Sequence, residues 1–110
     1  MKSTAILGVA ILLGLGSSPV LAQGNYETGR QLAYTCTGCH GITGYKNAYP
    51  FYNVPKIAGQ NYTYLLNALK AYQNGEREHP TMQAQAESYS EQDLMDISTF
   101  LSQVTKRGDK

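Results

Sequence analysis

Two patterns of apolar residues divide the chain. Residues 5–16 contain only Ala, Ile, Leu, Val and Gly. Further along, apolar side chains recur at the three- and four-residue spacing of amphipathic helices, and no segment shows useful strand alternation. The pattern predicts an all-α domain with three main helices, preceded by an apolar N-terminal segment.

The N-terminal segment, residues 1–22, has the parts of a secretory signal peptide. Lys2 precedes the apolar run, a Ser-Ser-Pro sequence ends it, and Val20 and Ala22 supply the small side chains of a cleavage site. We therefore expect cleavage after Ala22, which leaves residues 23–110 as the mature domain. An uncleaved membrane anchor is the alternative, but the run is shorter than the ~20 apolar residues of a spanning helix.

The first predicted helix runs from residue 26 to about residue 36, with Asn25 as its N-cap. Gly29 lies inside this helix, where glycine costs ~1 kcal/mol relative to alanine. A glycine retained there indicates a face that another helix approaches closely, and the last helix is the expected partner.

The other two helices have clear boundaries. One runs from about Asn61 to Asn74, before Gly75, and its face carries Tyr62, Leu65, Leu66, Leu69 and Tyr72. The last begins after Ser90, with Asp93 as the capping-box acid. Its buried stripe, flanked by Phe100, consists of Leu94, Ile97, Leu101 and Val104.

Composition excludes several classes of protein. The 110 residues include 9 basic and 8 acidic side chains, and loss of the signal peptide makes these numbers equal. A nucleic-acid binder would normally carry a basic face, so nucleic acid is not an expected partner. Two cysteines are too few for a disulfide framework or a four-cysteine zinc site. A domain this small often depends on a cofactor for its stability.

The sequence Cys36-Thr37-Gly38-Cys39-His40 supplies that cofactor, because C-x-x-C-H is the attachment motif of a c-type haem. Two thiols one helical turn apart can each add to a vinyl group, and His40 then lies under the iron as proximal ligand. The motif occurs once, so we expect one covalently bound haem c per chain.

Three other interpretations of the two cysteines are weaker. A thioredoxin-like dithiol needs a βαβ context, which is not visible in the sequence. A zinc site needs two further ligands, and His79 is the only remaining histidine. A structural disulfide would leave the adjacent His40 unexplained.

Residues 41–60 form a predicted loop rich in Gly, Pro and aromatic side chains. Loops this long are usually functional, and this one could wrap the proximal side of the haem. A ligating histidine nearly always donates its other N–H, and the backbone oxygen of Pro55 is the candidate acceptor. A plain surface loop stiffened by prolines is the alternative. The role of the Tyr-rich residues 45–52 is open.

The sixth iron ligand must come from downstream of the motif. Met95 lies in the last helix beside its apolar stripe, so we expect it to pack there. Met82 follows Pro80 in a stretch interpreted as non-helical, residues 79–82, where a stiffened loop could hold a thioether against the iron. Met82 is therefore favoured, with His79 or an open, water-ligated position as alternatives.

From Gly29 to about Leu101 the chain resembles a small bacterial monohaem class I cytochrome c, and a single domain of the tandem dihaem cytochromes of that class. The resemblance rests on Gly29 and the C-x-x-C-H motif, and on three further segments at residues 54–60, 75–82 and 90–94. It implies first and last helices crossed near Gly29 and Phe100, His40 and Met82 as axial ligands, and haem attachment after export.

The same resemblance implies that Arg77 contacts a haem propionate, although a solvated surface arginine is equally compatible with the sequence. A haem with both axial positions filled by protein exchanges electrons and does not bind substrate. We therefore expect a periplasmic, non-enzymatic one-electron carrier. Its partners would be redox proteins such as dehydrogenases, oxidases or other cytochromes, with membranes reached only through membrane-bound partners.

Two alternatives remain at this point. One is a haem subunit permanently bound to a dehydrogenase or oxidase complex. The other is a haem enzyme or gas sensor with an open sixth position.

Overall fold

The computed structural model describes residues 24–42 and 54–104, with a few isolated positions between 5 and 16. The predicted cleavage site after Ala22 and the Tyr-rich residues 45–52 lie outside this part. The described residues form five α-helices and no strand, which confirms the all-α fold class. The helices are α1 (Tyr26–Leu32), α2 (Tyr34–His40), α3 (Tyr62–Gln73), α4 (Pro80–Glu87) and α5 (Glu91–Gln103).

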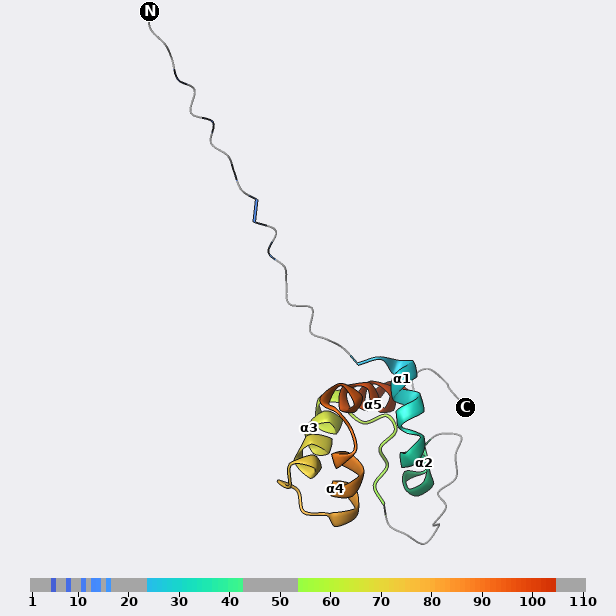
Figure 1. Ribbon diagram of the computed structural model, residues 1–110. Helices are drawn as coiled ribbons and strands as arrows, with labels where there is room; N and C mark the ends of the chain where they lie inside the picture. Colours follow the sequence, from blue (N-terminus) through green and yellow to red (C-terminus); the bar gives the residue numbers. More distant parts are fainter. Residues whose placement is uncertain are drawn as a thin grey trace, which may run out of the picture.

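The five helices form one cluster, with α1 and α5 at one end and α2 and α4 toward the other (Figure 1). α1 and α5 pack together at one end of the domain, and α3 packs against both α4 and α5. α2 continues from α1 down the other side, so that α2 faces α3 and α4 across the domain (Figure 1). None of the described helices combines the length and the apolar character needed to cross a bilayer.

The helix caps predicted at Asn25 and Ser90 are confirmed, since each side chain accepts a hydrogen bond from a backbone N–H three residues ahead. Asn61, predicted only as the approximate start of a helix, caps α3 in the same way. Asp93 completes a capping box by accepting from the Ser90 N–H at 2.9 Å. Gly75, after α3, has a φ of 83°, which is the left-handed conformation that favours glycine at this position.

The first helix was predicted to be continuous to about residue 36, and this is wrong. α1 ends at Leu32, the chain turns at Ala33, and α2 runs on through the C-x-x-C-H motif to His40. At the turn the Cys36 N–H donates to the Ala33 carbonyl oxygen at 2.9 Å. Ala33 is fully buried in the core, so tertiary packing overrides the high helix propensity of alanine.

The interpretation of residues 79–82 as non-helical is also wrong. Pro80 is the first residue of α4, a position that proline favours because it has no N–H to satisfy. The N-cap is His79, whose Nδ1 accepts a hydrogen bond from the Met82 N–H at 3.2 Å. Three main helices were predicted, and α4 and the division of the first helix bring the number among the described residues to five.

The hydrophobic core is organised around α5. Its predicted stripe is confirmed, since each member is at most 2% exposed: Leu94, Ile97, Leu101 and Val104. The flanking Phe100 is buried too, at 5% exposed. α1 covers another face of α5, where the Tyr26 and Phe100 rings meet edge to face at 5.3 Å. Because α5 lies between α1 and α3, its polar side chains Asp96, Ser98, Thr99 and Ser102 are buried as well.

Candidate functional site

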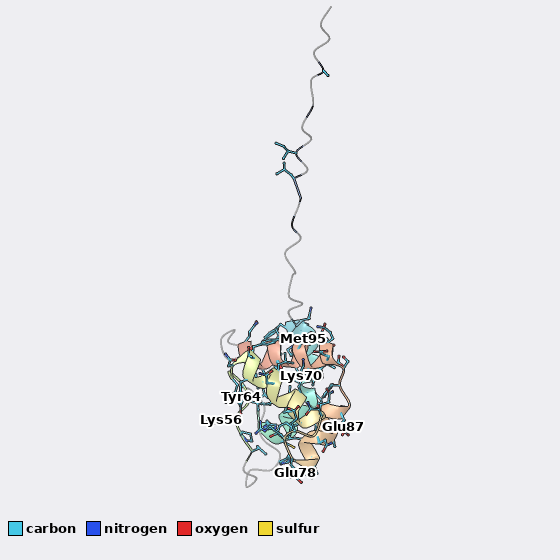
Figure 2. All side chains as sticks on the ribbon, turned by 90° about the vertical axis from the view of Figure 1, so that its left-hand side faces the viewer. Lys56, Tyr64, Lys70, Glu78, Glu87 and Met95 are labelled. Atoms are coloured by element: carbon cyan, nitrogen blue, oxygen red, sulfur yellow. The ribbon has the colours of Figure 1, made fainter. Side chains whose placement is uncertain are left out.

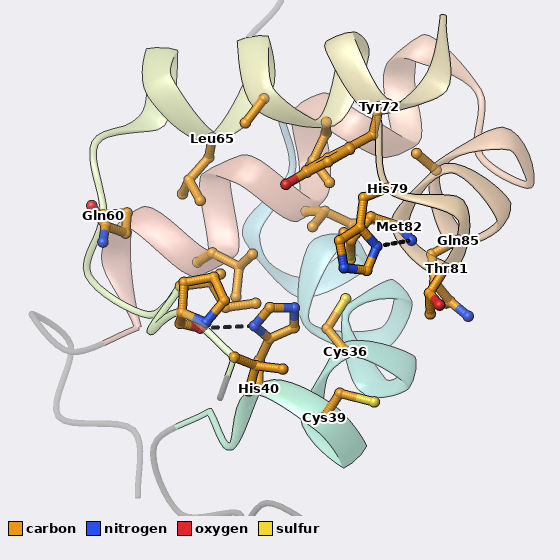
Figure 3. Close-up of a pocket in the computed structure, with 18 of the residues that line it drawn as sticks. Cys36, Cys39, His40, Gln60, Leu65, Tyr72, His79, Thr81, Met82 and Gln85 are labelled. Atoms are coloured by element: carbon orange, nitrogen blue, oxygen red, sulfur yellow. Dashed lines mark hydrogen bonds between the residues drawn. The ribbon is translucent and has the colours of Figure 1, made fainter. Parts of the chain in front are cut away.

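A cavity of about 250 Å³ lies between α2, α3, α4 and the segment of residues 54–60 (Figure 3). Ile97 and Leu101 of α5 also contribute to its lining. The candidate residues from separate parts of the sequence meet here: Cys36, Cys39, His40, Pro55, Arg77, His79 and Met82. The lining is mainly apolar, so the fold brings a reactive motif to the edge of a hydrophobic cleft.

α2 supplies the two thiols. Cys36 and Cys39 are free and lie one helical turn apart, and both line the cavity. Cys36 is the more enclosed of the two, and its burial raises the pKa of its thiol above the ordinary cysteine value. Cys39 is exposed. The pair is therefore arranged along the cavity wall, with Cys36 inside and Cys39 at the edge.

His40, the last residue of α2, has a fixed ring orientation. Its Nδ1 donates a hydrogen bond to the backbone oxygen of Pro55 at 2.8 Å (Figure 3). A carbonyl oxygen can only accept, so Nδ1 carries a proton, and in the neutral imidazole the lone pair that can bind a metal is then on Nε2. Gly41 follows with a φ of 58°, which ends the helix and lets the chain turn away.

Met82 reaches the same cavity from the first turn of α4 (Figure 3). The hydrogen bond from its N–H to the ring of His79 fixes the start of the helix that carries it. Met95 does not line the cavity. It lies at the end of the domain formed by α1 and α5, away from Glu78 at the other end (Figure 2).

Arg77 lies on the exposed connection between α3 and α4 and contributes to the cavity lining. Its guanidinium carbon stands 4.6 Å from the centre of the Tyr72 ring, in a cation–π contact. The Tyr72 ring also meets the His79 ring edge to face at 6.2 Å. These contacts hold a positive charge near the edge of an otherwise apolar cavity.

Sequence reasoning missed three further residues near the site. These are Tyr89, Thr35 and Gln73. Tyr89, after α4, hydrogen-bonds to Thr35 of α2, and Nε2 of Gln73 in α3 donates to the backbone oxygen of Tyr89. No sequence signal could have revealed the contact with Thr35, because it depends on the turn at Ala33.

The model of the cytochrome c family matches residues 26–105. The chain belongs to the cytochrome c family. Proteins of this family carry covalently bound haem c, so haem c is the cofactor of this chain.

Three similar proteins differ in how much of their length the chain covers. A cytochrome c4 of Pseudomonas aeruginosa is 35% identical over 86% of this chain, which covers only 46% of that protein. The chain thus spans about half the length of this relative, as it does for the cytochrome c4 of Stutzerimonas stutzeri, of which it covers 48%. A cytochrome c-554(548) of Halomonas halodenitrificans is 35% identical over 72% of this chain and 95% of its own length.

The residues of the cavity fit haem c. Attachment needs two thiols on one helical turn, which Cys36 and Cys39 provide at the cavity wall. A proximal ligand needs an imidazole whose other nitrogen is hydrogen-bonded, as Nδ1 of His40 is to the Pro55 oxygen. An apolar lining suits the porphyrin faces, and the exposed Arg77 is available for an acidic substituent.

Proposed function

We propose that the chain is a one-electron carrier whose haem is attached through Cys36 and Cys39 and ligated by His40 and Met82. One observation carries this proposal. The imidazole of His40 and the thioether of Met82 come from different helices and line the same cavity, and the hydrogen bond to Pro55 holds His40 in place.

The bound haem c supplies a reversible one-electron change at iron. The chain contributes the environment that limits it to this chemistry. His40 and Met82 would both hold the iron, and a substrate or dioxygen would then have no free position at which to bind. A thioether favours the ferrous state, so Met82 in place of a second histidine would raise the reduction potential. The apolar lining would offer water few hydrogen-bond partners around the haem.

The proposal includes export and attachment in the periplasm. Residues 1–22 would act as a signal peptide cleaved after Ala22, and residues 23–110 would form the functional domain. The partners would be redox proteins that dock at the exposed haem edge through a small, transient interface. Arg77, at the cavity edge, would contact a propionate there. After cleavage the numbers of basic and acidic side chains are equal, so we expect only weak long-range electrostatic attraction of charged partners.

A permanent subunit of a larger enzyme is a second candidate. The cytochrome subunit of the sulfide dehydrogenase of Chlorobaculum tepidum is 26% identical over 86% of this chain and 82% of its own length. By analogy with that subunit, the chain would remain bound to a catalytic partner instead of diffusing between partners.

One set of measurements on the haem-loaded protein tests the proposal. A carrier with a filled sixth position should titrate reversibly with one electron and should not bind carbon monoxide rapidly after reduction. Rapid binding would show an open sixth position. Co-purification with a catalytic chain from the native source would support the subunit candidate, whereas isolation of the single chain supports the carrier.

A further inference from the structure

A single tyrosine joins the end of α4 to the turn between α1 and α2. Tyr89 follows α4, is half-buried, and lines the cavity. Its hydroxyl oxygen lies 2.8 Å from Oγ1 of Thr35 and 3.1 Å from the carbonyl oxygen of Leu32. These two residues stand on either side of the turn at Ala33.

The turn explains why Leu32 has a carbonyl available. In a continuous helix the Cys36 N–H would donate to the Leu32 oxygen four residues earlier. Here that N–H donates to Ala33, and Tyr89 donates to the Leu32 oxygen. A phenol has one proton, so the Thr35 hydroxyl must donate to Tyr89. Tyr89 therefore completes the hydrogen bonding of the turn directly before Cys36.

The other end of this connection is held from α3. Nε2 of Gln73 donates to the carbonyl oxygens of Ala86 and Tyr89, at 3.0 and 2.8 Å. Both carbonyls lie at the C-terminal end of α4, and Met82 lies in the first turn of the same helix. Side-chain hydrogen bonds thus run from α3 through the end of α4 to the start of α2.

This connection matters because α2 and α4 each pack mainly against one neighbouring helix. α2 packs against α1, and α4 packs against α3. α2 carries His40 and α4 carries Met82. The distance between these two side chains across the cavity therefore depends on the contacts that connect α2 to α4. Tyr89 links them directly.

We propose that Tyr89 is a positioning residue that sets the separation of α2 and α4 and so keeps Met82 bound opposite His40. This inference rests on the proposed ligand pair. Without the phenol hydroxyl, the Leu32 oxygen and the Thr35 hydroxyl lose a partner, and α2 can move relative to α4. Met82 should then leave its position more often.

The test uses Tyr89→Phe in the haem-loaded protein, because phenylalanine keeps the ring and removes only the hydroxyl. The measurement is the rate at which imidazole binds the ferric protein, since imidazole can enter only after the sixth ligand has left. We expect binding to be about tenfold faster, as for the loss of one to two hydrogen bonds. Tyr34→Phe is the matched control: Tyr34 lies on α2, is 70% exposed, does not line the cavity, and should leave the rate unchanged.

Thr35→Val is a second variant that removes one of the two hydrogen bonds. It should raise the imidazole-binding rate by less than Tyr89→Phe, and it decides the matter if Tyr89→Phe does not fold. Wild-type rates in the folded variants would overturn the proposal, even if the denaturant midpoint fell, because that result shows a packing role alone. A wild-type ferric protein without a methionine–iron charge-transfer band would contradict the proposed ligands. A normal band combined with unchanged rates would contradict only the role of Tyr89.

Discussion

Gly29 of α1 lies directly against the backbone of Asp96 in α5. A Cβ atom added at Gly29 would stand 1.9 Å from the Asp96 carbonyl oxygen and 3.0 Å from Cβ of Phe100. Backbone cannot yield as a flexible side chain can, so only glycine allows the two helices to approach this closely. This contact fixes α1, from which α2 and the haem-attachment motif continue.

We therefore predict that Gly29→Ala destabilises the protein, although alanine has the higher helix propensity. Forcing a methyl group into this contact should cost about 1–3 kcal/mol or more in the free energy of unfolding. Guanidinium unfolding of the haem-loaded protein measures the change. Gly38→Ala in α2 is the control, because nothing lies within 4 Å of its added Cβ. It should be neutral or stabilising by up to ~1 kcal/mol, and equal losses in both variants would contradict the account.

The carboxylate of Asp96 is predicted to hold the start of the domain. Asp96 is 4% exposed, and its Oδ1 accepts hydrogen bonds from the Asn25 N–H at 2.6 Å and from Nε2 of Gln92 at 2.9 Å. Asp96→Ala leaves these donors without an acceptor and should cost about 1–3 kcal/mol in the free energy of unfolding. Asp96→Asn keeps an oxygen in the same place and should retain most of the stability. If both variants lost the same free energy of unfolding, the oxygen that accepts these hydrogen bonds would not be the source of the stability.

The ion pair between Lys70 of α3 and Glu91 of α5 predicts a dependence of stability on pH. The hydrogen bond from Lys70 lowers the pKa of Glu91 below the ordinary glutamate value. A lowered pKa in the folded state stabilises the protein above the ordinary pKa, and the effect is lost as the pH falls through the lowered value. Because the pair is on the surface, the effect should be small and sensitive to salt.

The test compares the free energy of unfolding of Glu91→Gln with that of the wild type, at about pH 7 and at about pH 3. The variant should be slightly less stable at the higher pH, and the difference should vanish at the lower pH. In a Lys70→Met background the same substitution should show no such dependence. A difference that persists in that background would assign the effect to another group.

The sequence predicted the helices whose caps and apolar stripe are local features. Asn25, Ser90 and the stripe of α5 are examples. A cap and its partner are three residues apart, and the apolar residues of the stripe recur along one helix face, so both patterns are visible in the sequence itself. The turn at Ala33 could not be predicted in this way. Alanine carries no breaking signal, and the turn depends on packing against α5 and on a hydroxyl from Tyr89, both distant in sequence.

α4 was missed for a different reason. Pro80 was interpreted as stiffening a loop, although proline is equally suited to the first turn of a helix, and Gln and Ala residues that favour helix follow it. His79 is an unusual N-cap, since its ring nitrogen takes the place of a hydroxyl or carboxylate oxygen. The candidate ligands were nevertheless identified from the sequence, because neither the C-x-x-C-H motif nor the shortage of other possible ligands depends on local conformation, and these candidates line one cavity.

The most direct test of the account is the methionine–iron charge-transfer band in the absorption spectrum of the ferric, haem-loaded protein. Met82→Ala should abolish the band and let the reduced protein bind carbon monoxide rapidly. Met95→Ala is the matched control, because Met95 does not line the cavity, and it should leave the band in place. Persistence of the band in Met82→Ala, or its loss in Met95→Ala alone, would contradict the assignment of Met82 as the sixth ligand.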